Sequence, residues 1–169
     1  ATFDSYLSQI NGKTAALFKL SGTYGLISGN AIADDLHDIV SELGENLGMT
    51  FQLLDDYLDF ESITQQLSLG KPIGQDIRNG IYTAPVLFAL TDPTVNTEVR
   101  ALLMQRDAIR DADMIRLHEL ITQSHAMTKL NALLTDYTDK LQALIARLPE
   151  PTIQTQLEQL SHLLLNRNH

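Results

Sequence analysis

Apolar residues recur at helical spacing along almost the whole chain. Between residues 33 and 63 they step by three, four and seven positions, which predicts one long amphipathic helix. The further helices that this spacing predicts cover residues 4–29, 80–90, 95–105, 112–123 and 126–148, and one more follows Pro151. No stretch shows the strict alternation of a half-buried strand. The pattern therefore predicts an all-α helical bundle.

Glycine and proline mark the breaks between these helices. Residues 68–76 hold two glycines and a proline and read as a loop, and Pro93 stands where a new helix can begin. Gly25 and Gly29 sit four positions apart, either to admit a neighbouring helix or simply to end the first one. Without a repeat or a linker, we expect a single domain over residues 1–169.

One polar stripe interrupts the apolar surface of the long helix. At about 100° per residue, Gln52, Asp55, Asp56 and Asp59 fall within an arc of roughly 100°, with apolar side chains on both sides. Carboxylates this close repel one another, and a hard divalent cation with oxygen ligands relieves the repulsion. The stripe indicates a metal site that faces a cavity. The alternative is a solvated helix face, although such a face is usually broad and mixed.

A second Asp-Asp-x-x-Asp pattern, at residues 34–38, serves as a comparison. Its acids belong to a broad polar arc that continues through Ser41, Glu42 and Glu45. They also stand in the first turn of the helix, where the helix dipole favours negative charge. We interpret this copy as an ordinary solvent-facing surface.

Two lysines are candidates for binding a phosphate group. Lys71 lies in the glycine-bearing loop, from which it can reach a phosphate while the loop backbone offers donors. Lys13 flanks Thr14, which projects onto the apolar face of the first helix. An exposed lysine and a threonine bonded to its own backbone are the structural alternatives. The functional interpretation requires Lys13 and Thr14 to point at the acidic stripe.

Composition removes several classes of protein. Lys and Arg number 12 against 21 Asp and Glu, so the net charge is −9, and the pI is near 4.8. Bulk attraction to a nucleic acid is therefore excluded. The absence of cysteine excludes disulfides, thiolate zinc sites and cysteine nucleophiles, and it fits a cytoplasmic protein. The longest apolar run, residues 84–90, is too short to span a membrane.

Four motifs in order resemble the C-terminal half of the trans-prenyltransferases, the polyprenyl diphosphate synthases. They are Gly-Lys-Thr-Ala-Ala-Leu-Phe at 12–18, Gly-x-x-Phe-Gln-x-x-Asp-Asp-x-x-Asp at 48–59, Leu-Gly-Lys-x-x-Gly-x-Asp at 69–76, and Thr-Ala-Pro-Val at 83–86. The match spans residues 6–90, and the helices over 94–166 complete the chain. The resemblance implies the isoprenoid synthase type of helical bundle, here without its N-terminal helices.

The resemblance also implies an activity and a role for each motif residue. An allylic diphosphate ionises, the double bond of isopentenyl diphosphate attacks the cation, and loss of a proton leaves a chain one isoprene unit longer. Asp55 would be the main Mg²⁺ ligand, supported by Asp56 and Asp59. Lys13 and Lys71 would hold the diphosphate. Thr14 and Gln52 would turn oxygens toward the developing cation.

The chain departs from the family pattern in two ways. Nothing matches the family's first aspartate-rich motif with its paired arginines, and Ile81 stands where many members carry lysine. We therefore expect a truncated chain with little activity alone, which self-associates as a homo-oligomer, a dimer, to cover apolar faces left open. Two alternatives stay open: a non-catalytic subunit or interaction module, and a class I terpene cyclase, which the loop at 69–76 disfavours.

Overall fold

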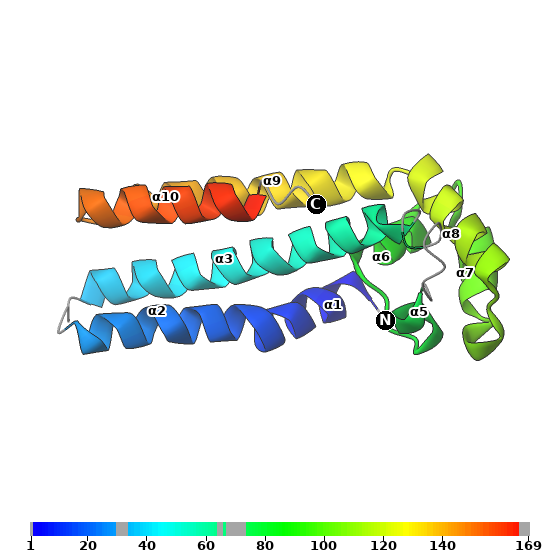
Figure 1. Cartoon of the computed structure of the whole chain (residues 1–169), viewed down its shortest axis with the longest axis horizontal. Coiled ribbons are helices and arrows are strands. Elements are labelled where there is room, and N and C mark those ends of the chain that lie inside the picture. Colours follow the sequence, from blue (N-terminus) through cyan, green and yellow to red (C-terminus); the bar gives the residue numbers. More distant parts are fainter. Residues whose placement is uncertain (1, 30–33, 64–65, 67–73, 166–169) are drawn as a thin grey trace. The chain divides into compact units, whose positions relative to one another are not determined.

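The computed structural model describes residues 2–29, 34–63, 66 and 74–165, and no strand occurs in these ranges. The helices are α1 (Phe3–Ile10), η1 (Asn11–Ala15), α2 (Ala16–Ser28), α3 (Asp34–Glu61), α5 (Gln75–Arg78), α6 (Ala84–Thr91), α7 (Asn96–Leu103), η2 (Arg106–Ala108), α8 (Asp111–Gln123), α9 (Ala126–Ile145) and α10 (Pro151–Leu165). Figure 1 shows them along the chain. The predicted all-α class is confirmed.

The first predicted helix is continuous but not regular. Asn11–Ala15 forms a π-helical turn between α1 and α2, and Lys13 and Thr14 lie within it. A five-residue change of hydrogen bonding leaves no mark on an apolar pattern read over longer windows, so the sequence did not predict it. Such turns are rare and occur often at functional sites.

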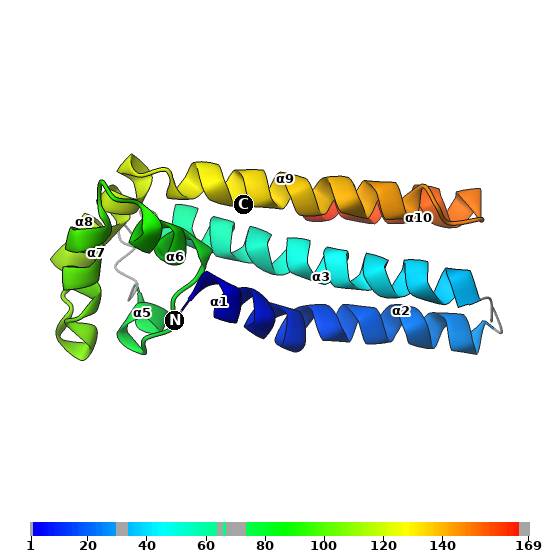
Figure 2. The same ribbon diagram turned by 180° about the vertical axis from the view of Figure 1, so that it is seen from behind.

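Two glycines of α3 let the first helix approach very closely. A Cβ on Gly48 would lie 2.5 Å from Ala15 Cα, and one on Gly44 would lie 2.7 Å from Lys19 Cα. Gly25, by contrast, has open space around it, and Gly29 is the C-cap of α2. The close approach thus occurs at Gly44 and Gly48 rather than at Gly25 and Gly29. Figures 1 and 2 show α2 running alongside α3.

The segment after the acidic helix differs from the prediction. The loop expected over 68–76 lies outside the described residues up to 73, and α5 then forms a single turn that the sequence did not indicate. The next helix begins at Ala84 instead of residue 80. Gly80 has a φ of +76° and Thr83 is extended, while Pro85 stands in the first turn of α6, where its missing N–H costs nothing.

The chain divides into two compact units. Unit 1 comprises Ala1–Tyr6 and Asp55–Ala132, and unit 2 comprises Leu7–Leu54 and Leu133–His169. The helices α3 and α9 each continue from one unit into the other. The expected single domain over residues 1–169 stays a prediction.

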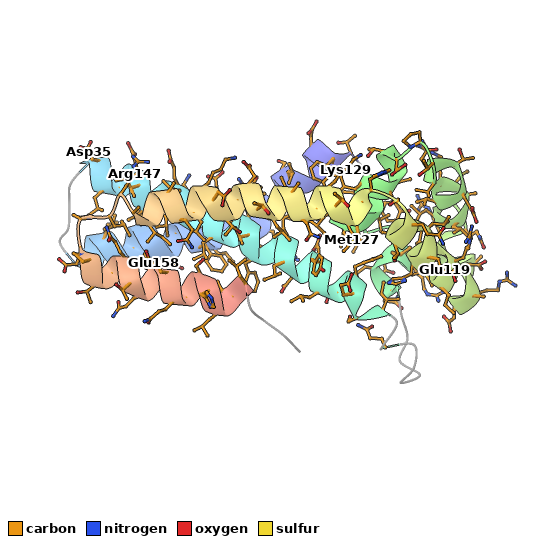
Figure 3. All side chains as sticks on the ribbon, turned by 90° about the horizontal axis from the view of Figure 1, so that it is seen from above. Asp35, Glu119, Met127, Lys129, Arg147 and Glu158 are labelled. Atoms are coloured by element: carbon orange, nitrogen blue, oxygen red, sulfur yellow. The ribbon has the colours of Figure 1, made fainter. Side chains whose placement is uncertain are left out.

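Each unit has its own hydrophobic core. The buried core residues of unit 1 are Phe60, Val86, Ala89, Val95, Val99, Leu103, Ile109, Met114, Leu117, Leu120, Ile121 and Ala126. Those of unit 2 are Ile39, Leu43, Leu47, Leu141, Leu144, Ile145 and Leu148. In unit 2, Figure 3 shows α9 beside α10, with Glu158 on α10 and Arg147 in the turn between the two helices. The apolar stripes of these helices therefore form the cores that the sequence pattern predicts.

One apolar surface in unit 2 is left open among the described residues. Leu17, Leu20, Tyr24 and Ile27 recur at spacings of three, four and three along α2, and each is at least 60% exposed. This spacing is that of an a/d seam, which normally faces another helix. We call these four residues the α2 seam.

Candidate functional site

The central acid of the predicted metal motif is turned into the core of unit 1. Asp56 is only 4% exposed. Its Oδ2 accepts a hydrogen bond of 2.6 Å from the Tyr6 hydroxyl and one of 3.1 Å from the backbone N–H of Ala84. The second bond satisfies a free N–H at the start of α6, which is what a capping side chain does. This carboxylate therefore helps to hold α1 and α6 against α3.

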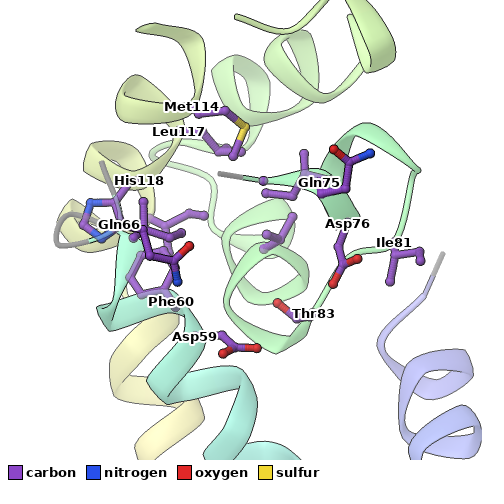
Figure 4. Close-up of a pocket in the computed structure, with 15 residues that line it drawn as sticks. Asp59, Phe60, Gln66, Gln75, Asp76, Ile81, Thr83, Met114, Leu117 and His118 are labelled. Carbon is purple, nitrogen blue, oxygen red and sulfur yellow. The ribbon is translucent and has the colours of Figure 1, made fainter. Parts of the chain in front are cut away.

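Asp59, one turn further along α3, is exposed and lines a pocket of unit 1. The pocket has a volume of about 270 Å³. Figure 4 shows Asp59, Thr83 and Asp76 along one side of it, with the ring of Phe60 and the side chains of Met114 and Leu117 further in. The pocket thus joins a polar rim, which carries two carboxylates, to an apolar interior.

The three acids of the motif do not form a ready-made cage. Asp55 is half-buried, Asp56 is buried and Asp59 is exposed. Across the described ranges, no group of three or more His, Asp or Glu side chains is arranged to hold a metal ion. The acidic stripe of α3 therefore contains carboxylates in different environments. Asp56 forms hydrogen bonds inside the core, and Asp59 lies at the rim of the pocket.

In unit 2, the π turn brings the predicted Lys-Thr pair against α3. Thr14 Oγ1 donates a hydrogen bond of 2.9 Å to Gln52 Oε1. A hydroxyl has one donor hydrogen and two acceptor lone pairs, so this bond orients the lone pairs of Thr14. Two of the predicted site residues, 38 positions apart in sequence, are thereby placed side by side, and Thr14 does not bond to its own backbone.

Neighbouring contacts hold the π turn in place. Asn11 donates a hydrogen bond of 2.8 Å to Glu45, and Lys19 forms a salt bridge of 3.7 Å with the same carboxylate. Together with the backbone contact at Gly48, these bonds fix the position of Lys13 and Thr14 along the axis of α3. Sequence spacing alone could not have indicated Asn11 or Glu45.

The two predicted phosphate-binding lysines have different outcomes. Lys13 is exposed, and no salt bridge to it occurs within the described part of the chain. Lys71 lies outside the described residues. Gly74, which follows that loop, has a φ of +66°, and a Cβ there would meet Met114 Cε at 2.2 Å. The end of the loop is therefore tightly packed against α8.

Other residues near the site were not predicted from the sequence. Tyr6 had no visible partner because Asp56 lies 50 residues away. His118 stacks on Phe60 with ring centroids 4.5 Å apart, and burial lowers its pKa from the ordinary value of 6.5. Asp76 and Thr83 belong to the quoted sequence motifs, but no role was predicted for them. The structure shows that both line the pocket of Asp59. The comparison copy behaves as predicted, since Asp35 and Asp38 are exposed on α3.

Fold, motifs and sequence comparison agree on one family. The family model described as Polyprenyl synthetase matches residues 1–121. The chain belongs to the polyprenyl synthetase family. This match covers all four motifs, including the π turn with Thr14 and the acidic segment of α3.

Relatives of named function support this assignment. The chain is 37% identical to the mitochondrial hexaprenyl pyrophosphate synthase of Saccharomyces cerevisiae, over 98% of this chain and 34% of that protein. It is 36% identical to heptaprenyl diphosphate synthase component 2 of Geobacillus stearothermophilus, over 86% of this chain and 43% of that protein. The crystal structure of geranylgeranyl pyrophosphate synthase from Lactobacillus brevis, complexed with citrate, superposes with a TM-score of 0.86 at 34% identity.

The chain covers only part of these proteins. It spans about one third to two fifths of the two curated relatives, and 99% of it matches 53% of the Lactobacillus brevis structure. None of the described helices is long and apolar enough to cross a bilayer. Since the yeast relative is mitochondrial by name, the expected cytoplasmic location stays a prediction.

Proposed function

We propose that the chain carries the diphosphate-binding half of the site of a chain-elongating prenyltransferase. The observation that carries the proposal is the hydrogen bond from Thr14 to Gln52, which joins the Lys-Thr turn to the acidic helix. The substrates would be an allylic diphosphate and isopentenyl diphosphate, and the products a longer allylic diphosphate and inorganic diphosphate.

The available donors fit a magnesium ion that is shared with a substrate. Mg²⁺ usually takes one or two carboxylates and completes its shell with water and substrate phosphates. Asp55 and Asp59 would supply those carboxylates, and Asp56 would position them, since its Oδ2 bonds Tyr6 and Ala84. When bound, the ion would neutralise charge on the departing diphosphate.

The remaining residues would act on the two charges that ionisation creates. The ammonium group of Lys13 would bind the diphosphate, which becomes more negative as it leaves. The Thr14 hydroxyl, oriented by Gln52, would present its lone pairs to the allylic cation. Donors and dipoles fixed before the reaction stabilise such charge without reorganisation, which is the largest effect in many enzymes.

Calorimetric titration of this chain with geranyl diphosphate tests the proposal. We expect Mg²⁺-dependent binding that weakens at least about tenfold in Asp55→Asn, Asp59→Asn and Lys13→Gln, as for a lost charge-assisted contact. Asp38→Asn, on the exposed comparison copy, is the matched control and should bind as the unchanged chain does. Equal binding by all four variants would contradict the proposal.

Turnover separates the related activities. A longer protein that contains this chain should form product only when both diphosphates are present, whereas a terpene cyclase needs the allylic diphosphate alone. The chain by itself should turn over little, because nothing in its sequence matches the family's first aspartate-rich motif with its paired arginines. A rate typical of complete enzymes, with kcat of about 1 per second or more, would refute that expectation.

A second candidate is the subunit of a two-component synthase. One relative is called component 2, and the α2 seam offers a surface for a helical partner. In that case a second polypeptide with the other aspartate-rich motif should restore turnover when it is mixed with this chain. We also propose that, without such a partner, copies of the chain associate through the seam as a homo-oligomer.

A further inference from the structure

A second hollow of unit 1 lies between the end of α6, the C-terminal part of α7 and η2. It has a volume of about 210 Å³, about seven times the share of one molecule in liquid water. Its lining consists of Tyr82, Leu90, Arg100, Leu103, Met104 and Arg106. None of these residues lines the pocket of Asp59. The hollow is therefore separate from the site described above.

Two arginines line this hollow without a carboxylate partner. Among the described residues, the salt bridges of arginine are Arg78–Asp111, Arg110–Asp113, Arg116–Glu98, Arg116–Glu119 and Arg147–Glu42. Arg100 and Arg106 form none within that part of the chain. Both side chains are exposed to solvent at the hollow.

The acids next to the two arginines in sequence form no salt bridge with them among the described residues. Glu98, two positions before Arg100, is bound by Arg116 at 2.7 Å and 3.1 Å. Asp107 follows Arg106 directly but is not part of the lining. Both arginines line the same hollow, so an anion bound there can accept hydrogen bonds from both guanidinium groups.

The backbone of Arg106 adds an independent observation. Its φ is +47°, which makes it the one non-glycine residue with positive φ in the described ranges. A side chain is strained in this left-handed region, where glycine fits freely. Residues held in such conformations cluster at active sites, ligand-binding sites and switch regions.

The rest of the lining is apolar. Leu103 is buried, Leu90 is half-buried, and Met104 is 77% exposed at the rim. Tyr82 adds a ring and a hydroxyl that can donate. The lining therefore combines a doubly cationic part with an apolar part, which together suit an anion on a short hydrocarbon stem.

We propose that this hollow binds the phosphate or diphosphate group of an organic ester, with the ester's first carbons against Leu90 and Leu103. Paired arginines match phosphate oxygens through bidentate hydrogen bonds. Binding here needs no metal, so it does not depend on the aspartate motif. The ester could be a soluble metabolite or the headgroup of an anionic phospholipid.

Titration with hexyl phosphate in the presence of EDTA tests the hollow apart from the proposed metal-dependent site. We expect saturable binding that weakens about tenfold in Arg100→Gln, as for one lost charge-assisted contact. Arg106→Gly should weaken binding similarly and at the same time raise the thermal midpoint, because the strain is relieved. Met104→Asp, at the exposed rim, should also weaken binding by repulsion.

Arg147→Gln is the matched control, since it removes the same charge from an exposed position in unit 2. Equal weakening in Arg147→Gln and Arg100→Gln would overturn the proposal in favour of bulk charge. Undiminished affinity in Arg106→Gly would overturn it as well. Binding to phosphatidic acid vesicles, but not to hexyl phosphate, would support the site and identify the lipid as its source. No binding to either would refute it.

Discussion

The hydroxyl of Tyr6 lies 2.6 Å from a carboxylate oxygen of Asp56, in the buried interior of unit 1. One partner comes from the first helical turns and the other from the acidic motif. The bond is charge-assisted and shielded from water, so it contributes more than an exposed contact would.

Removing the hydroxyl should therefore destabilise the protein. We expect Tyr6→Phe to lower the free energy of unfolding by about 1.5–3 kcal/mol, since a bond to a charged group is lost in the interior. Urea denaturation monitored by circular dichroism measures the change. Tyr24→Phe, on the exposed α2 seam, is the control, and we expect a change within about 0.5 kcal/mol. Equal effects of the two substitutions would contradict this account.

The acids of the motif should separate into different roles. Asp56→Asn removes the charge that Tyr6 and Ala84 face, so we expect it to destabilise unit 1 by about 1–3 kcal/mol. Asp59→Asn should mainly weaken Mg²⁺-dependent diphosphate binding, because this side chain is exposed at the pocket rim. Unfolding and calorimetry on both variants give the comparison. If Asp59→Asn were the more destabilising of the two, the division of roles would be wrong.

The contact between the π turn and α3 depends on a missing side chain. In Gly48→Ala, the new Cβ would meet Ala15 Cα at 2.5 Å, so the two helices must separate. We expect this overpacking to lower the free energy of unfolding by about 1–3 kcal/mol. It should also weaken diphosphate binding, because Thr14 is displaced. Gly25→Ala is the matched control. It should raise the free energy of unfolding by about 0.5–1 kcal/mol, because alanine favours the helix and has open space there. If urea denaturation showed that both substitutions change the free energy of unfolding in the same direction, the proposed backbone contact at Gly48 would be wrong.

Asp92 provides a pH prediction outside the site. It is 2% exposed and accepts hydrogen bonds from the backbone N–H and side chain of Thr94, and from the backbone N–H and ring of His125. These bonds, that of the Thr94 hydroxyl first, hold the pKa of Asp92 well below its ordinary value of 3.8.

Because the pKa is depressed in the folded state, this stabilisation is complete above pH 3.8 and is lost as pH falls through the folded pKa. Asp92→Asn should therefore lower the thermal midpoint more at pH 6 than at pH 2.5. Calorimetric scans at both values decide this. A constant difference would show that the charge of Asp92 contributes nothing.

The α2 seam leads to a prediction about association. We expect this chain to self-associate at micromolar concentration, because four large apolar side chains at a/d spacing are exposed on one helix. Leu20→Glu should shift it to the monomer in light scattering. Ser21→Glu, one position further along α2, leaves the seam intact and serves as the control. A monomeric unchanged chain would refute the prediction.

Sequence periodicity predicted the long helices well, and α3, α8 and α9 each bury an apolar stripe, whereas Ile153 and Leu160 of the equally well predicted α10 stay exposed. It missed α5, a single turn too short to show a period, and it placed the start of α6 four residues early. The motif supplied Gln52 and the three acids, but their orientations depend on partners distant in sequence. Asp56 faces inward because of Tyr6 and Ala84, and Thr14 bonds Gln52 because a π turn and Gly48 place it there.

The backbone contact at Gly44 and Gly48 has a consequence for how such a site can diversify. Where two helices touch through main-chain atoms, no rotamer change can widen or narrow the gap between them. If Lys13 and Thr14 act as proposed, the part of the site that they form would therefore have a fixed width, whichever substrate is bound. Under the proposed function, adaptation to longer or shorter hydrocarbon chains would then take place at other walls of the protein, without disturbing the bond between Thr14 and Gln52.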